Sequence, residues 1–416
     1  MKIDWSVFND EVKIGVDLCS KIEDYGYEAY IVGGCVRDIV LWKKSGSKGD
    51  PKVHDVDIAT NMPIDELYDK FKCASNNGEA HGTILVIHKG EPFEVTQFRT
   101  DGDYTDGRHP DSVQFTKSFR DDTARRDFTI NAMGIDCNGN LIDYHGGEQD
   151  LENGILRTVG NAKQRFSEDA LRIIRALRFA SRFGMKIDDE TLEGIDEIKG
   201  NLSKIAKERI GAELIKTAEY GAKPFYNVIN LINDTHICEV IDSSDTVDWD
   251  IATLLTKYRL TRGTPELAKD IKCAFGCMLY SSDLYEAAKN FRLENSLIKS
   301  LKWVYDNMKT YEHFGEDLVE TVKMVNNKDF YLLTEIYKIV KNTKATDKEV
   351  QIIKQLSDQV LPHSKELSAA IIDAGIKGQY FGKALKKLSN WFYTETLNGN
   401  MPTENDINVF AKSLLL

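Results

Sequence analysis

The stretch IVGGCVRD (residues 31–38), followed by VHDVDIAT (residues 53–60), decides the fold of this chain. The first stretch is an apolar run that ends in a double-glycine turn. The second predicts a short apolar strand that carries Asp55 and Asp57 at one-residue spacing. Because side chains alternate faces along a strand, we expect both carboxylates on one face, with Cα atoms roughly 6.5–7 Å apart. Like charges at that distance repel unless a cation lies between them.

Magnesium suits such a pair, because it takes hard oxygen ligands and shares them with substrate phosphates. Backbone N–H groups around Gly33 and Gly34 can meet those phosphates, since glycine permits close approach of the backbone. An isolated D-x-D is usually a solvated strand edge, and an isolated Gly-Gly is usually a plain turn. The two together, in this order, indicate metal-assisted chemistry on a nucleoside triphosphate.

The chain has 416 residues, of which 42% are hydrophobic and 29% charged, enough for two to four packed units. No uncharged apolar stretch reaches about 18 residues, and the acidic start MKIDWSVFNDE lacks an apolar signal core, so we expect no membrane span and no leader. The seven scattered cysteines include Cys273 and Cys277 at helix spacing. Free thiols are the expected state, which favours the reducing cytoplasm.

The net charge of −12 argues against a nonspecific nucleic-acid binder. Positive charge is nevertheless concentrated between residues 161 and 182, where six basic residues accompany Glu168 and Asp169. Those six are Lys163, Arg165, Arg172, Arg175, Arg178 and Arg182. Any contact with nucleic acid is therefore expected to be local.

The first 150 residues or so mix predicted helices and strands, and helical periodicity dominates from residue 161 onward. Pro63 suits the first turn of a helix, and the residues after Arg99 are rich in Asp, Gly and Pro, as in a mobile loop. The predicted elements are helices 5–25 and 63–72, strands 28–32 and 53–59, and a hairpin of strands 83–87 and 93–99 around a turn at 89–92. Weak breaks in the helical part fall near 221–224, 342–346 and 361–364. The change from mixed elements to helical periodicity near residue 161 marks the boundary between an α/β head and an all-helical remainder.

Further motifs follow in order: RRDFTINAM (125–133), DYHGGEQDL (143–151), EDALR (168–172) and ERI (208–210). With the two opening motifs, this set resembles the class II tRNA nucleotidyltransferase family, which comprises the CCA-adding enzymes and bacterial poly(A) polymerases. The resemblance covers roughly residues 30–215. GIKGQYFGKAL (375–385) is similar to the family's tail signature, although Gln379 stands where proline is usual.

The resemblance implies an α+β fold: a polymerase-β-type nucleotidyltransferase head with a mixed sheet, followed by an all-α neck, body and tail. The expected divisions are a catalytic head (1–150), a neck for nucleotide selection (151–220), a body (221–345) and a tRNA-binding tail (346–416). The implied activity is addition of C, C and A to the 3′ end of tRNA from CTP and ATP, without a template and with release of pyrophosphate. The implied partners are the tRNA 3′ end, CTP and ATP, with no membrane, in a monomer or homodimer.

The catalytic residues implied by the resemblance are Asp55, Asp57 and Glu94, with two Mg²⁺ ions held by Asp55 and Asp57. Two-metal sites stabilise the attacking and the leaving oxygen of a displacement. A solvent-facing acid on a strand is the alternative for Glu94.

Nucleotide binding is implied for Gly33, Gly34, Arg37 and Asp38 at the triphosphate. A guanidinium meets phosphate oxygens in a bidentate manner, although Arg37 can also form a salt bridge and Asp38 can orient Arg37 instead of touching substrate. Arg126 and Asp127 would read the ribose and position the phosphates, or would form an ion-paired surface turn.

Asp169 and Arg172 are the implied base-selecting pair, and their spacing predicts one shared helix face. The carboxylate accepts from the exocyclic amine of cytosine or adenine, while the guanidinium donates to the ring. Uracil and guanine would place a carbonyl oxygen against the carboxylate, which disfavours them. Ordinary helix chemistry, with Ser167 as cap and a Glu168–Arg172 pair, is the alternative. Arg175 and Arg178 are implied nucleotide ligands as well; with Arg165 and Arg182 they can instead meet tRNA phosphates or order the neck.

Three other segments carry expectations. DGRHP (106–110) resembles the loop that accompanies the change from CTP to ATP, or is a solvated turn. Gly146 and Gly147 resemble the hinge between head and neck, or form a simple turn. Lys377, Lys383, Lys386 and Lys387, near Tyr380 and Phe381, would seat the tRNA elbow or belong to an amphipathic packing helix.

The sequence favours a CCA-adding enzyme over its relatives. A poly(A) polymerase is disfavoured by the acidic chain and the lack of an Arg-rich extension, whereas an A-adding-only enzyme stays open. A noncatalytic RNA- or nucleotide-binding protein is the alternative of another class, against which the intact acids argue. A phosphohydrolase is set aside, because no His-Asp dipeptide with suitable partners follows residue 160.

Overall fold

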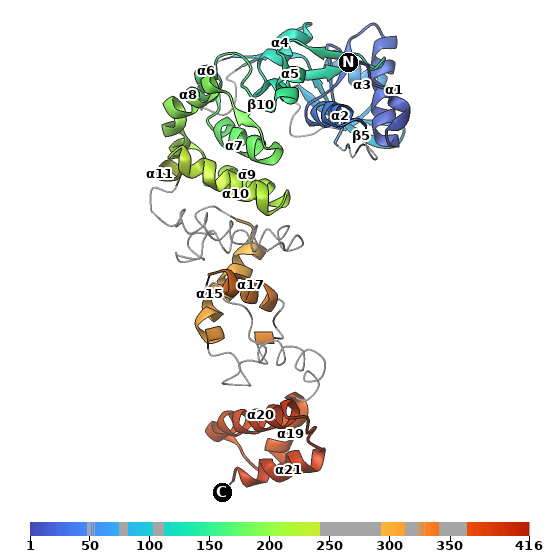
Figure 1. Cartoon of the computed structure of the whole chain (residues 1–416). Helices are drawn as coiled ribbons and strands as arrows, with labels where there is room; N and C mark the ends of the chain where they lie inside the picture. The colour runs from blue at the N-terminus through green and yellow to red at the C-terminus, as the bar shows by residue number, and fades with distance from the viewer. Residues whose placement is uncertain are drawn as a thin grey trace. The chain divides into compact units, whose positions relative to one another are not determined.

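The computed structural model divides the chain into two compact units, which are described separately (Figure 1). The first unit comprises residues 1–217 and 230–241, and the second comprises 218–229 and 242–416. The structure describes residues 1–47, 51, 53, 55–74, 82–102, 112–241, 293–312, 324–325, 327, 329–340 and 364–415. The expected head, neck, body and tail boundaries stay predictions.

The first unit is built on a seven-stranded mixed sheet in the order β3-β4-β5-β2-β1-β8-β9. Within the described part of this sheet, β2 and β5 pair in parallel and the other neighbours pair in antiparallel fashion. The strands are β1 (Ala29–Val32), β2 (Asp57–Thr60), β3 (Lys72–Ala74), β4 (Thr83–His88), β5 (Glu91–Gln97), β8 (Met133–Ile135) and β9 (Leu141–Asp143). The mixed sheet of the predicted fold class is confirmed.

Helices and short ribbons surround this sheet. Helix α1 packs against β1, β2, β4 and β5, and Tyr30 of β1 stacks on Phe119 of α4 at 4.3 Å between ring centroids. The elements up to residue 153 are η1 (Trp5–Val7), α1 (Asp10–Asp24), α2 (Gly34–Lys44), α3 (Ile64–Lys70), β6 (Arg99–Asp101), β7 (Val113–Phe115), α4 (Phe119–Ala124), η3 (Thr129–Asn131) and α5 (Gly147–Asn153). Buried aromatic and aliphatic side chains thus hold the elements that surround the site.

The expected hairpin is present, with a shorter turn than predicted. Lys89 and Gly90 alone connect β4 to β5, and both have positive φ (50° and 92°), which suits the twist of a two-residue hairpin. The predicted helix 5–25 is interrupted: η1 ends at Val7, and the side chain of Asn9 caps α1 by accepting from the Val12 N–H.

The predicted strand over residues 53–60 is wrong in its first half. Strand β2 begins at Asp57, and Asp55 lies before it with φ of +56°, a left-handed conformation that aspartate tolerates better than most residues. The Asp55 backbone N–H donates to Glu11 of α1 at 3.1 Å. Strand alternation therefore does not place the Asp55 carboxylate beside that of Asp57.

After residue 153 the first unit is mainly helical, as expected. Arginine-rich α7 is amphipathic and buries nine of its side chains. The elements up to residue 241 are β10 (Ile155–Leu156), α6 (Ala162–Glu168), α7 (Leu171–Phe183), β11 (Lys186–Ile187), α8 (Asp189–Ile198), η4 (Lys199–Lys204), α9 (Lys207–Glu219), α10 (Ala222–Asp234) and α11 (Cys238–Ile241). Residues 218–229, at the end of α9 and the start of α10, belong to the second unit.

The second unit contains two helical clusters among its described residues. Helices α15 (Asn295–Glu312) and α17 (Phe330–Val340) share one apolar core, and α19 (Ser364–Asp373), α20 (Phe381–Leu397) and α21 (Glu404–Ser413) share another. The short helix η6 (Gly378–Tyr380) precedes α20 and buries none of its residues. In the latter, Trp391 and Phe410 stack at 4.5 Å between ring centroids. No described helix is long and apolar enough to cross a membrane.

Candidate functional site

The double-glycine turn lies between β1 and α2, where it approaches the carboxylate of Asp57. Gly33 has φ of +78° and ψ of −143°, a conformation that side-chain-bearing residues rarely adopt. A Cβ at Gly33 would lie 3.2 Å from Asp57 Oδ2, and Val32 pairs with Asp57 across the two strands. The turn therefore requires glycine both for its backbone angles and for the space beside Asp57.

Asp57 and Glu94 come from adjacent parallel strands. Ile58 pairs with Val95, so the preceding residues, Asp57 and Glu94, occupy equivalent places on β2 and β5. Burial, the charge of Glu94 and the charge of Asp55 together raise the pKa of Asp57 to about 6, against an opposing effect of Arg126. The three predicted catalytic carboxylates are therefore electrostatically coupled, although Asp55 and Glu94 are solvent-exposed.

The donor set fits a metal ion that completes its coordination with substrate. In the described part of the chain, no group of three or more His, Cys, Asp or Glu side chains is arranged to hold an ion. Magnesium, however, is usually bound by one or two carboxylates together with substrate phosphates and water. The raised pKa of Asp57 comes first from its burial and then from the charges of Glu94 and Asp55, and a bound cation would offset both effects by favouring the ionised carboxylate.

Arg37 of α2 is almost wholly buried and points into the cavity. Its Nε donates to Asp38 at 2.9 Å and its Nη1 donates to Asn131 Oδ1 at 2.8 Å. The guanidinium also lies over the rings of Phe179 and Phe183, at 5.3 and 4.7 Å from their centroids. Asp38, which is not part of the cavity lining, is placed to orient Arg37.

Asp127 links the head to α7. Arg175 donates to its Oδ2 from Nε at 3.0 Å and from Nη2 at 2.7 Å, and Asn131 Nδ2 donates to its Oδ1 at 3.2 Å. Burial by itself would raise the pKa of Asp127, but Arg175 and these hydrogen bonds hold it below its usual range. Asp127 is thus an ionised carboxylate inside the site.

The prediction that Asp169 and Arg172 lie on one helix is wrong. Helix α6 ends at Glu168 and α7 begins at Leu171, with Asp169 in extended conformation between them. The Asp169 carboxylate accepts from the Leu171 N–H at 3.0 Å and from Arg209 Nη2 at 2.8 Å. This break in the helix is what turns Asp169 toward the cavity.

Arg172 is fixed by partners other than Asp169. Its Nη1 donates to Glu168, the expected i,i+4 pair, and to the carbonyl oxygen of Arg165 at 2.9 Å. Arg165 in turn donates to Glu168 and to the carbonyl oxygens of Ala124 and Arg125, so it supports the loop and does not line the cavity. Ser167 does not cap the helix; its hydroxyl donates to the Lys163 carbonyl.

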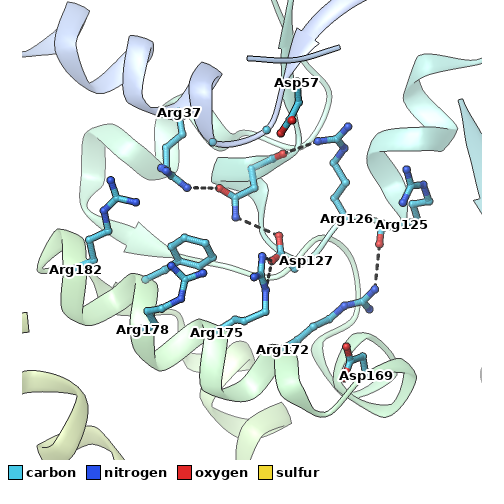
Figure 2. Close-up of a pocket in the computed structure, with 14 residues that line it drawn as sticks. Arg37, Asp57, Arg125, Arg126, Asp127, Asp169, Arg172, Arg175, Arg178 and Arg182 are labelled. Atoms are coloured by element: carbon cyan, nitrogen blue, oxygen red, sulfur yellow. Dashed lines mark hydrogen bonds and ion pairs between the residues drawn. The ribbon is translucent and has the colours of Figure 1, made fainter. Parts of the chain in front are cut away.

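One cavity of about 490 Å³ brings most of the predicted residues together (Figure 2). In Figure 2, Asp57 lies across the cavity from Arg172, Arg175 and Arg178, which extend from one helix. The lining residues are Gly33, Gly34, Arg37, Asp57, Arg125, Arg126, Asp127, Asn131, Asp169, Arg172, Arg175, Arg178, Phe179 and Arg182. Such a cavity, in which guanidinium groups outnumber the carboxylates of Asp57, Asp127 and Asp169, is suited to a polyphosphate ligand.

Sequence reasoning did not assign Arg125, Asn131, Phe179 or Arg182 to the cavity. Arg182 follows Arg175 and Arg178 at helical spacing, which was the available signal. Asn131 connects Arg37 to Asp127 through contacts that its position in sequence does not reveal. Conversely, Asp38, Asp55 and Glu94 are not part of the lining.

Other predicted segments fall elsewhere. The loop DGRHP (106–110) and the helix predicted around Cys273 and Cys277 lie outside the described residues. Gly147 has no room for a side chain, because a Cβ would lie 2.2 Å from the Thr129 carbonyl oxygen. The neighbouring turn is held by Asp143, which accepts the backbone N–H groups of residues 145–148.

The second unit contains a separate cavity of about 610 Å³ at the tail motif. Lys377, Lys383 and Lys387 line it with Tyr380, whose side chain is exposed. Phe381 packs against the apolar core of the tail helices instead. The segment thus contains an amphipathic packing helix, α20, and Lys383 and Lys387 of this helix line the cavity. Seating of the tRNA elbow stays a prediction.

Comparison with known proteins places these features in a family. Residues 29–157 match the model of the poly(A) polymerase head domain, and residues 184–223 match that of the probable RNA- and SrmB-binding site of polymerase A. The chain is 44% identical over 214 residues to a CCA-adding enzyme of Oceanobacillus iheyensis, an alignment that covers 51% of this chain and 52% of the relative. It is 40% identical over 286 residues to a CCA-adding enzyme of Pediococcus pentosaceus, which covers 68% of each.

Solved structures share the fold. The Bacillus stearothermophilus CCA-adding enzyme in complex with CTP aligns with a TM-score of 0.70 at 23% identity, over 94% of each chain. The Thermotoga maritima CCA-adding enzyme complexed with tRNA aligns with a TM-score of 0.69 at 21% identity, over 100% of this chain and 97% of that one. The chain spans about half the length of the first curated relatives it matches and two thirds of the one from Pediococcus pentosaceus. On these matches, the chain belongs to the family of CCA-adding enzymes and poly(A) polymerases, the nucleotidyltransferases expected from its motifs.

Proposed function

We propose that this protein adds C, C and A to the 3′ end of tRNA from CTP and ATP and releases pyrophosphate. The observation that carries the proposal is the single cavity in which the glycine turn and Asp57 meet both Asp169 and Arg172. A carboxylate for metal-dependent transfer and a pair suited to base selection thus face one bound nucleotide.

Asp57 and Asp55 would hold the Mg²⁺ ions, with Glu94 as the third carboxylate. When bound, the ions would lower the energy of the charge that develops on the attacking and leaving oxygens. The arginines of the cavity hold the triphosphate, Gly33 and Gly34 present backbone N–H groups to it, and Asp127 accepts from the ribose hydroxyl. In-line attack by the tRNA 3′-hydroxyl on the α-phosphate then forms the new phosphodiester bond and breaks the bond to pyrophosphate.

Asp169 and Arg172 select the base in this proposal. Arg209 and the Leu171 N–H fix the Asp169 carboxylate, which still has lone pairs for an exocyclic amine. Glu168 orients Arg172, whose guanidinium donates to the acceptor atoms of the cytosine or adenine ring. A base that offers a carbonyl oxygen to Asp169 leaves two acceptors opposed, and such mismatches in buried sites cost about 10⁴-fold or more.

Residues 151–220 are assigned to nucleotide selection and residues 346–416 to tRNA binding, with the basic cavity of the tail as the contact surface. We place the protein in the cytoplasm, as a monomer or homodimer. The five cysteines in the described part, Cys19, Cys35, Cys73, Cys137 and Cys238, are all free, as is usual in a reducing compartment.

The test is incubation of the protein with tRNA that lacks its CCA end, with CTP and ATP supplied separately and together in Mg²⁺. We expect CTP alone to add two residues and both nucleotides to add three. The name of the matching head-domain model favours poly(A) polymerase activity as the second candidate, which would give long A tails. Addition of a single A only to tRNA that already ends in CC would indicate an A-adding enzyme, and no incorporation at all would indicate a noncatalytic binding protein.

A further inference from the structure

Asp122 of α4 is a wholly buried carboxylate directly behind the cavity. Its Oδ1 accepts from Arg125 Nη2 at 2.8 Å and Nε at 3.1 Å, and its Oδ2 accepts from Arg126 Nη2 at 3.3 Å. The Arg99 backbone N–H donates to it as well, at 3.2 Å. Both arginines line the cavity, whereas Asp122 does not touch it.

The sequence spacing explains this geometry. Helix α4 ends at Ala124, and Arg125 keeps right-handed helical angles, so residues three and four after Asp122 turn back over its side chain. Two adjacent guanidinium groups repel each other, and each long side chain has many rotamers. One carboxylate that binds a different arginine with each oxygen fixes both of them in one orientation.

The charge of Asp122 is maintained in spite of its burial. Burial by itself would raise its pKa, but Arg125 and Arg126 hold that pKa below its usual range. Arg125 also lies 3.9 Å from Asp101. Asp122 therefore remains ionised throughout the neutral range.

The two arginines keep donor capacity toward the cavity. A guanidinium has five N–H donors, and Asp122 accepts from only some of the donors of each arginine. Among the described residues, Arg126 Nε is a buried donor with no hydrogen-bond partner, so the protein itself leaves part of the donor capacity of Arg126 unused. A phosphate oxygen is the acceptor that matches this charge and geometry.

We propose that Asp122 is a positioning residue, which presents Arg125 and Arg126 as one rigid cationic surface to the polyphosphate of the incoming nucleotide. This inference rests on the proposed function, since it assigns the polyphosphate of that nucleotide to these two arginines. It predicts that replacement of Asp122 weakens the binding of a nucleotide more strongly, the more phosphates the nucleotide carries. Asp122 itself does not contact the nucleotide.

The experiment is calorimetric titration of the full-length protein with CTP, CDP and CMP, in Mg²⁺ and without tRNA. For Asp122→Asn we expect CTP to bind about tenfold more weakly, CDP about threefold, and CMP less than about twofold. The matched control is Asp121→Asn, which changes the exposed neighbouring acid and should leave all three affinities unchanged. Equal weakening for CTP and CMP, or no weakening, would overturn the proposal.

A second variant covers the case in which Asp122→Asn does not fold. Asp122→Asn/Arg125→Gln removes both charges of the tighter pair, which avoids leaving the Arg125 cation buried without its carboxylate. Compared with Arg125→Gln alone, the double variant should bind CTP at least about threefold more weakly, because Arg126 has lost its support. Equal affinities of the two variants would contradict a positioning role.

The readout separates this inference from the proposed function. Binding is measured without tRNA, so a wild-type protein that binds CTP but extends no tRNA would refute only the proposed function, and the Asp122 comparison would still be decisive. A wild-type protein that binds no CTP would refute both.

Discussion

The carboxylate of Asp169 lies 2.8 Å from the guanidinium of Arg209, which follows it by 40 residues. Asp169 occupies the break between α6 and α7, and Arg209 lies on α9. A residue between two helices has more freedom than one inside a helix, so an ion pair to a third helix is an effective means of fixing its direction.

Arg209→Gln should therefore relax base discrimination. Asp169 would keep its hydrogen bond from Leu171 but lose its charged partner, which we expect to raise UTP or GTP incorporation relative to CTP or ATP by about tenfold. Misincorporation into tRNA lacking CCA, measured with single nucleotides, checks this. Lys204→Gln removes an exposed positive charge and is the control. Unchanged fidelity in Arg209→Gln would show that the pair does not direct Asp169.

Gly33→Ala should abolish nucleotidyl transfer and weaken nucleotide binding. The added Cβ is disfavoured at φ of +78° by about 1–3 kcal/mol and would lie 3.2 Å from Asp57 Oδ2, so either the turn or the carboxylate must move. Gly146→Ala is the control for a positive φ without a close neighbour, because Gly146 has φ of +79° with ψ of 23° and no atom lies within 4 Å of the added Cβ. Assays of both variants at equal folded fraction separate backbone strain from damage to the site. Equal activities would mean that Gly33 is not required at the site.

The sequence predicted the features that depend on local chemistry. A strand that ends in a double-glycine turn is present as expected, and residues from four separated motifs meet in one cavity. The resemblance supplied that grouping, since spacing alone cannot bring residues 33, 57, 127 and 169 together.

The errors arose where tertiary contacts override local pattern. Alternating residues predicted a strand through Asp55, but its N–H bonds to Glu11 from a distant helix, and its backbone turns left-handed. The spacing of Asp169 and Arg172 suited one helix, yet Asp169 pairs with Leu171 and Arg209 across a break. Asn131 was overlooked because a neutral amide carries no electrostatic pattern in sequence.

Glu213→Gln should destabilise the first unit. Glu213 and Arg178 form an ion pair in which both side chains are about 5% exposed, so removal of one charge leaves the other buried, at a cost of about 3–5 kcal/mol. Urea unfolding followed by circular dichroism measures the change. Glu197→Gln is the control, because its pair with Lys163 is more than half exposed and should contribute less than about 1 kcal/mol. Similar urea midpoints for Glu213→Gln and Glu197→Gln would contradict the claim that the buried ion pair stabilises the protein more than the exposed one.

The tail cavity should contribute to tRNA affinity through phosphate contacts. Lys377→Gln/Lys383→Gln/Lys387→Gln removes three positive charges around Tyr380, and we expect weaker tRNA binding and a shallower dependence of affinity on salt. Filter binding at several salt concentrations checks both. Lys365→Gln on α19, exposed but outside this cavity, should change neither. A triple variant with unaltered salt dependence would place the tRNA elsewhere.

Asp57→Asn should abolish transfer yet stabilise the metal-free protein at neutral pH. The folded-state pKa of Asp57 is raised from 3.8 to about 6, so the folded state retains a proton that the unfolded state has lost. Stability therefore falls as pH rises from about 4 to 6, and above that window the charged carboxylate costs about 1–3 kcal/mol.

In chelator, the melting temperature of Asp57→Asn should exceed that of wild type at pH 7.5 and match it near pH 4. Added Mg²⁺ should stabilise the wild type more than the variant, because the ion neutralises the carboxylate that the variant lacks. A variant that retains transfer, or that melts below wild type at pH 7.5 in chelator, would show that Asp57 is not the strained carboxylate of the site.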